Sequence, residues 1–75
     1  MDWRERITFE PGKRFGKPCI RGMRIAVEDI LSYLAAGDTE ESILAEWPEL
    51  EREDFRAIYA YAADSERHVK LLAGA

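Results

Sequence analysis

Residues 16–27 read Gly-Lys-Pro-Cys-Ile-Arg-Gly-Met-Arg-Ile-Ala-Val, and this stretch decides the fold of the N-terminal third of the chain. Gly16, Pro18 and Gly22 divide it into turns and short extended pieces, because glycine accepts left-handed backbone and proline removes a hydrogen-bond donor. A turn centred on Gly22 would pair residues 19–20 with residues 23–25. Such a ribbon is marginal on its own and has to lie on another element.

The segments on either side of this stretch have different hydrophobic periods. Residues 6–10 alternate polar and apolar side chains, which predicts a short strand that buries Ile7 and Phe9. From Val27 onwards the apolar residues recur at helical spacing, which predicts a first helix that ends at Gly37.

Two further helices complete the predicted layout. A short helix is expected over residues 40–46, where Pro48 stops it, and a longer one over about residues 52–72. The fold class is therefore mostly α, with short N-terminal β-strands in a hairpin followed by three helices in helix-turn-helix order. The chain is expected to form one domain, in which a β-rich basic arm (6–26) precedes a three-helix unit (27–72).

Composition excludes several classes of protein. Cys19 is the only cysteine and His68 the only histidine, so neither an internal disulfide nor a structural zinc site is expected, and no cofactor is implied. No stretch approaches the roughly 20 apolar residues that cross a bilayer, and the N-terminus does not read as a signal peptide. We therefore expect a cytoplasmic protein that does not use a membrane.

Catalysis has little support in the sequence. Cys19 and His68 could in principle form a nucleophile and its base, but one lies in a predicted strand and the other near the end of the last helix. The carboxylates are spread along helix surfaces, without a pair whose surroundings would raise one pKa. We expect a protein that is not an enzyme.

Charge is divided unequally along the chain. Residues 1–27 carry seven Lys/Arg against three Asp/Glu, a net +4, whereas residues 28–75 carry four against twelve, a net −8. This polarity points to macromolecular partners. In a DNA reader the start of the last helix enters the major groove, and Arg52 and Arg56 lie there one turn apart, although carboxylates stand between them. The DNA-facing candidates are Arg21, Arg24, Arg52 and Arg56, together with Lys13, Arg14 and Lys17 of the arm.

The third predicted helix suggests self-association. At 1.5 Å per residue it is roughly 30 Å long, more than a body of this size can cover. Tyr61, His68 and Leu71 share a second face beside the main apolar stripe, as the seam of a homodimer or a partner-docking surface would.

Strings distributed over about residues 6–65 resemble the prokaryotic domain of unknown function 433 family. They are Ile7-Thr8-Phe9-Glu10-Pro11, Gly16-Lys17-Pro18-Cys19-Ile20-Arg21-Gly22, Arg24-Ile25, Val27-Glu28-Asp29-Ile30-Leu31, Leu34-Ala35-Ala36-Gly37, Ile43-Leu44, Pro48-Glu49-Leu50 and Arg52-Glu53-Asp54-Phe55-Arg56-Ala57. This chain departs from the family pattern at Phe15, where a second glycine is usual. It departs again at Glu51, which replaces the Ser or Thr that would cap the third helix, a loss on the order of 1 kcal/mol.

The resemblance implies a winged or homeodomain-like helix-turn-helix fold and a role as the antitoxin of a type II toxin–antitoxin module. The partner would be a PIN-like ribonuclease toxin, and the antitoxin would also bind its operator DNA. We therefore expect an antitoxin-like regulator. The alternative is a dimeric protein-interaction module without a nucleic-acid role, in which the basic arm docks on an acidic partner.

Overall fold

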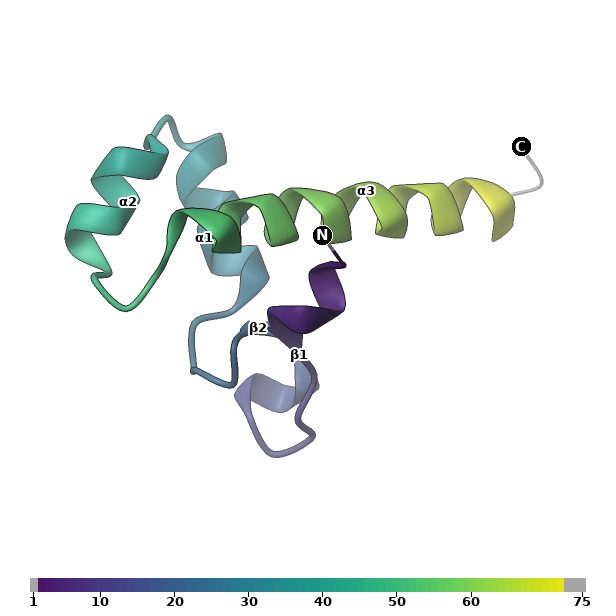
Figure 1. Cartoon of the computed structure of the whole chain (residues 1–75). Helices are drawn as coiled ribbons and strands as arrows, with labels where there is room; N and C mark the ends of the chain where they lie inside the picture. Colours follow the sequence, from purple (N-terminus) through teal and green to yellow (C-terminus); the bar gives the residue numbers. More distant parts are fainter. Residues whose placement is uncertain (1, 73–75) are drawn as a thin grey trace.

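The computed structural model describes the backbone of residues 2–72 and the side chains of residues 2–66. The elements, in chain order, are the 3-10 turn η1 (Trp3–Glu5), strand β1 (Ile7–Thr8), the turn η2 (Arg14–Gly16), strand β2 (Cys19–Ile20) and the helices α1 (Val27–Ala35), α2 (Glu40–Glu46) and α3 (Arg52–Leu72). In Figure 1, α3 is a long helix with α1 and α2 near its N-terminal end and the hairpin to one side. The predicted class, a hairpin followed by three helices, is confirmed.

The hairpin differs from the predicted one in its pairing. β2 pairs with β1 in antiparallel register, with Ile20 opposite Ile7, and residues 23–25 do not form a strand. The predicted turn does bring the chain back, because the Ile20 amide donates to the Ile25 carbonyl at 2.9 Å and Cys19 bridges Ala26. This contact is a single bridge and does not make a strand. The two-stranded ladder therefore consists of β2 and the upstream strand β1.

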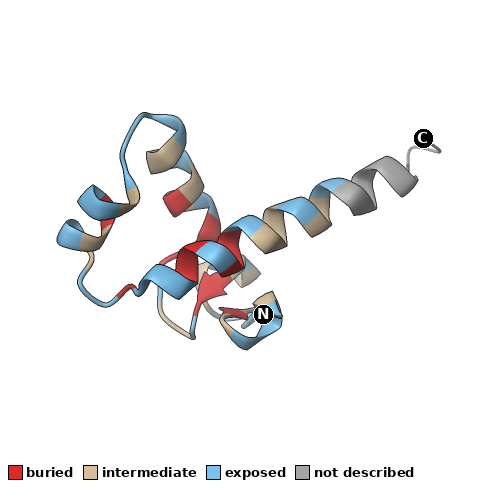
Figure 2. Ribbon diagram, turned by 45° about the horizontal axis from the view of Figure 1, so that its top comes forward, coloured by how far each residue is buried: buried red, intermediate tan, exposed pale blue. Residues whose placement is uncertain are grey.

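Apolar side chains from the hairpin and all three helices form one core. Figure 2 shows the buried residues gathered where the first turns of α3 meet α1 and the hairpin. This core contains Ile7, Ile20, Ile25, Val27, Ile30, Ile43, Leu50, Phe55, Ala57 and Ile58.

Phe9 is the exception among the predicted core residues, because 52% of it is exposed. The prediction was wrong because β1 ends at Thr8, and the alternation of faces ends with it. The Phe9 ring instead packs on Trp3, with centroids 6.2 Å apart, and on Tyr61, with centroids 6.0 Å apart.

Both α2 and α3 have well-defined starts. Thr39 and Ser42 form a reciprocal capping box at α2, in which each side chain accepts from the other residue's amide at 3.0–3.1 Å. At α3, Glu51 does not supply the usual cap, but the Asp54 carboxylate accepts from the Glu51 amide at 2.8 Å. One of the free amides at this helix end is therefore satisfied from within the first turn.

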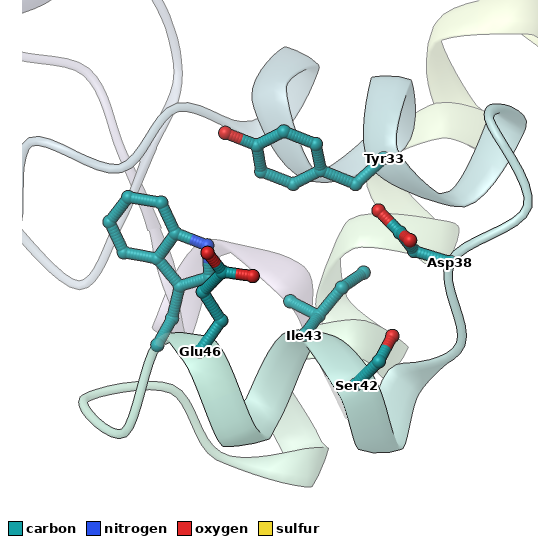
Figure 3. A pocket seen from close by; sticks show the side chains of 6 residues that line it. Tyr33, Asp38, Ser42, Ile43 and Glu46 are labelled. Atoms are coloured by element: carbon teal, nitrogen blue, oxygen red, sulfur yellow. The ribbon is translucent and has the colours of Figure 1, made fainter.

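The packing of α1 against α2 leaves a hollow of about 140 Å³ at the surface, lined by residues of both helices and of the segments that follow them (Figure 3). In the part of the chain that the structure describes, no helix combines the length and the apolar character needed to span a bilayer.

Candidate functional site

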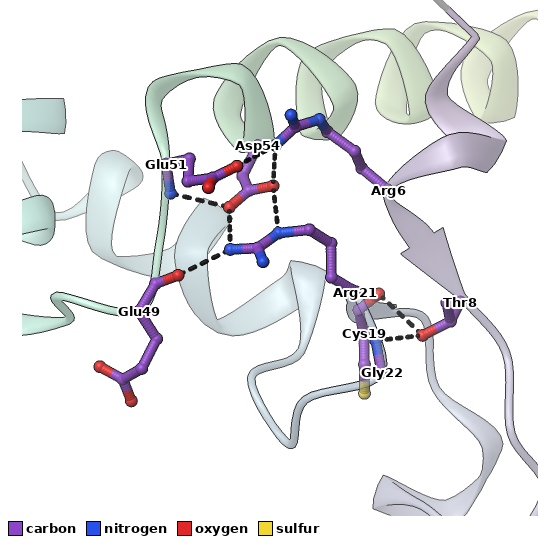
Figure 4. Close-up of polar contacts among 8 residues, drawn as sticks. All are labelled: Arg6, Thr8, Cys19, Arg21, Gly22, Glu49, Glu51 and Asp54. Atoms are coloured by element: carbon purple, nitrogen blue, oxygen red, sulfur yellow. Dashed lines mark hydrogen bonds and ion pairs between the residues drawn. The ribbon is translucent and has the colours of Figure 1, made fainter.

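A buried carboxylate joins the hairpin to the start of α3. Asp54 is fully buried and accepts from Arg6 at 2.9 Å, from Nε and Nη2 of Arg21 at 3.1 Å each, and from the Glu51 amide (Figure 4). Two cations and an amide thus replace its lost hydration. Burial raises the pKa of Asp54, but the hydrogen bonds from Arg21, Glu51 and Arg6 lower it by more, so this pKa lies below its ordinary value.

Arg21, a predicted DNA contact, directs its donors into the protein. In addition to its bonds to Asp54, its Nη2 donates to the Glu49 carbonyl at 2.6 Å. Arg21 and Gly22 both have left-handed backbone, with φ of 43° and 73°, and the Gly22 amide donates to Thr8 at 3.0 Å. The side-chain hydrogen bond to Asp54 raises the pKa of Arg21. Arg21 therefore fastens the turn that follows β2 to the start of α3.

Two further cations of the predicted DNA-binding arm are paired with the first turn of α1. Arg14 contacts Asp29 at 2.8 Å and Lys17 contacts Glu28 at 2.6 Å. The hydrogen bond to Asp29 raises the pKa of Arg14. These pairs place the arm on the positive end of α1, where the two carboxylates also favour the helix dipole.

Lys13 and Arg24 complete the arm, and they differ from each other. Lys13 contacts the Glu10 carboxylate at 3.1 Å and also donates to the Gly22 carbonyl. The Arg24 side chain is exposed and, within the described residues, forms neither an ion pair nor a side-chain hydrogen bond. Arg24 is thus the arm's one uncommitted cation in that part of the chain.

The shape of the arm was assigned to Gly16, Pro18 and Gly22. Gly16 has a left-handed φ of 78°, and the Pro18 carbonyl accepts from the amide of Val27 at 2.9 Å, which anchors the arm at the start of α1.

Phe15 stands out in the arm, because 97% of it is exposed. It has φ 60° and ψ 32°, and both of its neighbours, Arg14 and Gly16, are also left-handed. For a residue other than glycine this conformation costs roughly 1–2 kcal/mol. The charge pattern of the sequence does not single out Phe15 as a functional residue, although its position, where a glycine is usual, was a signal.

Arg52 and Arg56 lie on the exposed side of the first turns of α3. Their side chains are 63% and 77% exposed, and their ion pairs are long, at 3.5 Å from Arg52 to Glu41 and 3.8 Å from Arg56 to Glu53. Nearby, burial and a hydrogen bond to Glu40 raise the pKa of Tyr59 to about 12.

The predicted dimer face is only partly described. Tyr61 packs edge-on against Trp3, with centroids 5.0 Å apart, and the Trp3 indole donates to Asp64 at 2.6 Å. Tyr61 is therefore occupied within the chain by the N-terminal turn. The side chains of His68 and Leu71 lie outside the described residues.

Cys19 is buried in β2, and its thiol donates to the Lys17 carbonyl at 3.4 Å. Among the described residues, no three His, Cys, Asp or Glu side chains gather in a way that could hold a metal ion. The other side chain of the postulated catalytic pair, His68, is not described.

Comparison with known proteins agrees with this architecture. A crystal structure of a DUF433 member protein from Anabaena variabilis superposes with a TM-score of 0.77 at 28% identity, over 92% of this chain and 68% of that one. The uncharacterized protein y4eO of Sinorhizobium fredii is 39% identical over 59 residues, which are 79% of this chain and 27% of that protein. This chain thus spans about a quarter of the length of y4eO. The model of a family described as "Protein of unknown function (DUF433)" matches residues 7–62, and the chain is a member of that family.

Proposed function

We propose that this chain is a non-enzymatic regulator of the antitoxin type, which acts by binding a partner protein, a toxin of the PIN-like ribonuclease class. The observation that carries the proposal is Phe15, which combines nearly complete exposure with a left-handed backbone. Neither property benefits the isolated chain, since the ring buries almost nothing and the backbone is strained.

In a complex, burial of the Phe15 ring by a partner would contribute to the affinity. Full burial of a phenylalanine side chain contributes about 1.5–3 kcal/mol, and aromatic residues commonly anchor interfaces. Arg24 lies beside Phe15 in the same surface depression and has its charge available, so a carboxylate at the edge of the partner's pocket would complete the contact.

The same arm is a weak candidate for phosphate contacts. Lys13, Arg14, Lys17 and Arg21 already have carboxylate partners within 3.1 Å. Binding DNA through them would break four internal ion pairs, one of which involves the fully buried Asp54. This arrangement favours a protein partner for the arm.

Operator DNA is the second candidate ligand, and one observation favours it. Arg52 and Arg56 are exposed one turn apart on α3, with ion pairs no shorter than 3.5 Å, so both can turn towards phosphates or base edges at little expense. Glu53 lies between them and opposes that approach.

Co-expression with the product of the adjacent gene tests the main proposal. If that product arrests growth, the full chain should relieve the arrest and co-purify with it, and Phe15→Gly should weaken the complex by at least about tenfold. Arg4→Ala is the control, because Arg4 is an exposed cation away from this loop, and its side chain pairs with Asp2 and stacks on Trp3. A complex unaffected by Phe15→Gly would exclude this loop as the anchor.

Fluorescence anisotropy with the chain's own upstream duplex tests the second candidate. The upstream duplex should bind more tightly than a scrambled one, and the logarithm of the affinity should fall linearly with the logarithm of the salt concentration. Replacing Arg52 and Arg56 together by Ala should abolish selectivity without affecting the partner complex. Equal binding of the two duplexes would exclude recognition of the operator, and only the protein-interaction role would remain.

A further inference from the structure

The hollow between α1 and α2 has a chemically unusual lining. Ile43 is buried there, and Tyr33 and Trp47 are partly buried beside it. Figure 3 shows Asp38 and Glu46 on opposite sides of Ile43, the first from the segment between α1 and α2 and the second from the end of α2. An apolar centre is thus bordered by two aromatic rings and two carboxylates.

The carboxylates of Asp38 and Glu46 both lack a polar partner among the described side chains. In the part of the chain whose side chains are described, neither Asp38 nor Glu46 takes part in a side-chain hydrogen bond or an ion pair. The neighbouring carboxylates of α2 differ, because Glu40 and Glu41 both pair with Arg52. The hollow therefore carries about two negative charges that no cation described in this chain neutralises.

The two rings favour a flat cation. The centroids of Tyr33 and Trp47 are 6.5 Å apart, and their planes are inclined by only 20°. A guanidinium is planar, stacks on aromatic faces and carries N–H donors in its plane that suit carboxylates. An ammonium lacks the plane, an anion would be repelled, and an apolar group would strip water from two charges without replacing it.

We propose that this hollow binds an arginine side chain presented by a partner protein. The guanidinium lies against Tyr33 and Trp47 and donates to Asp38 and Glu46. The identity of the partner rests on the proposed function, but the recognition of arginine does not. The acidic three-helix unit (27–72) thereby has a partner contact that is separate from the Phe15 loop.

The first test uses a free arginine derivative. N-acetyl-arginine amide is titrated into the ¹⁵N-labelled full chain, and the two tryptophan indole signals are followed by NMR. We expect a saturable shift of Trp47 in the millimolar range, with little change at Trp3, which binds Asp64 away from the hollow. N-acetyl-citrulline amide, which has nearly the same shape without the charge, should bind at least about tenfold more weakly.

Matched carboxylate variants locate the site. Asp38→Asn combined with Glu46→Gln should weaken the binding of the arginine derivative by about tenfold or more. Glu49→Gln should leave it unchanged, because that exposed carboxylate is also unpaired among the described residues but does not line the hollow. Equal binding of the citrulline derivative, or an equal loss in Glu49→Gln, would overturn the proposal.

The partner complex supplies an independent readout. The double variant Asp38→Asn, Glu46→Gln should weaken that complex, whereas Glu49→Gln should not. If arginine binds but no partner complex forms, the proposed function fails and the site stands. If the complex forms equally well with the double variant, the partner does not use this hollow. Self-association that both Arg24→Gln and Glu46→Gln abolish would assign the hollow to a second copy of the chain and overturn the proposed occupant.

Discussion

Nε and Nη2 of Arg21 both reach the carboxylate of Asp54, at 3.1 Å to Oδ1 and 3.1 Å to Oδ2, across 33 residues of chain. A two-point contact of this kind fixes direction as well as distance. Because Arg21 lies in the turn that follows β2 and Asp54 lies in the first turn of α3, the pair sets the orientation of the arm relative to the helices. The motif that contains Arg21 therefore holds the arm against the helices.

Replacing Asp54 by Asn should destabilise the protein strongly. The amide has nearly the same shape but leaves Arg6 and Arg21 without their shared countercharge, and breaking a buried pair in this way costs about 3–5 kcal/mol. Urea unfolding followed by circular dichroism measures the loss. Glu53→Gln is the control, because Glu53 is exposed and its ion pair is 3.8 Å long. A loss in Asp54→Asn no larger than the control's would contradict the inferred role.

Stability should also depend on pH through Asp54. Its pKa in the folded protein is below the ordinary value, so its stabilising effect is fully present above about pH 4 and is lost as the pH falls through the folded pKa. The free energy of unfolding of the unmodified chain should therefore fall more steeply below about pH 4 than that of Asp54→Asn. Parallel curves for the two proteins would show that another carboxylate dominates acid unfolding.

Arg21→Lys separates charge from geometry. Lysine keeps the positive charge but cannot make the two-point contact with Asp54 and reach the Glu49 carbonyl as well, so we expect a loss of about 1.5–3 kcal/mol. Arg24→Lys is the matched control in the same turn, because Arg24 has no side-chain partner among the described residues. Thermal unfolding of the two variants measures the difference, and equal melting temperatures would refute the argument.

Phe15→Gly should leave stability unchanged or raise it by up to about 1 kcal/mol, since glycine removes the left-handed strain but gains freedom in the unfolded chain. The expected combination is an equally or more stable protein that binds its partner less well. Chemical denaturation measures the first half of this prediction. A clear loss of stability would mean that the ring packs on the protein, in conflict with its exposure.

The helices could be predicted from the sequence because their signals are local. The apolar spacing from Val27 and the Thr39 cap each act within a few residues, and both elements form as expected. The pairing of β2 could not be predicted in the same way, because residues 6–8 and residues 23–25 both offered it a partner. The choice between them depends on how each packs on the core, which no short window of sequence contains.

The candidate site was predicted less well, because counting charges does not reveal their partners. The arm's excess of cations suggested DNA, yet Arg14 meets Asp29 and Lys17 meets Glu28 across 15 and 11 residues of chain. Asp54 is one of the carboxylates between Arg52 and Arg56 that would oppose phosphate if exposed, but it is fully buried and binds Arg6 and Arg21. Its spacing from Glu51 was a usable signal, since an acidic residue three positions after a helix start commonly caps it.

The ion pairs of the arm also determine the electrostatic field that acts on a partner at long range. A cation and a carboxylate about 3 Å apart act as a dipole, whose field decays faster than that of a lone charge, so beyond the Debye length of about 8 Å the paired cations of the arm offer almost no attraction and only Arg24 does. The long-range field is then that of the net −4 chain, which hastens the approach of cationic surfaces and retards that of nucleic acids. Encounter rates that rise for a basic partner as salt is diluted, and fall for DNA, would be the kinetic mark of this neutralised arm.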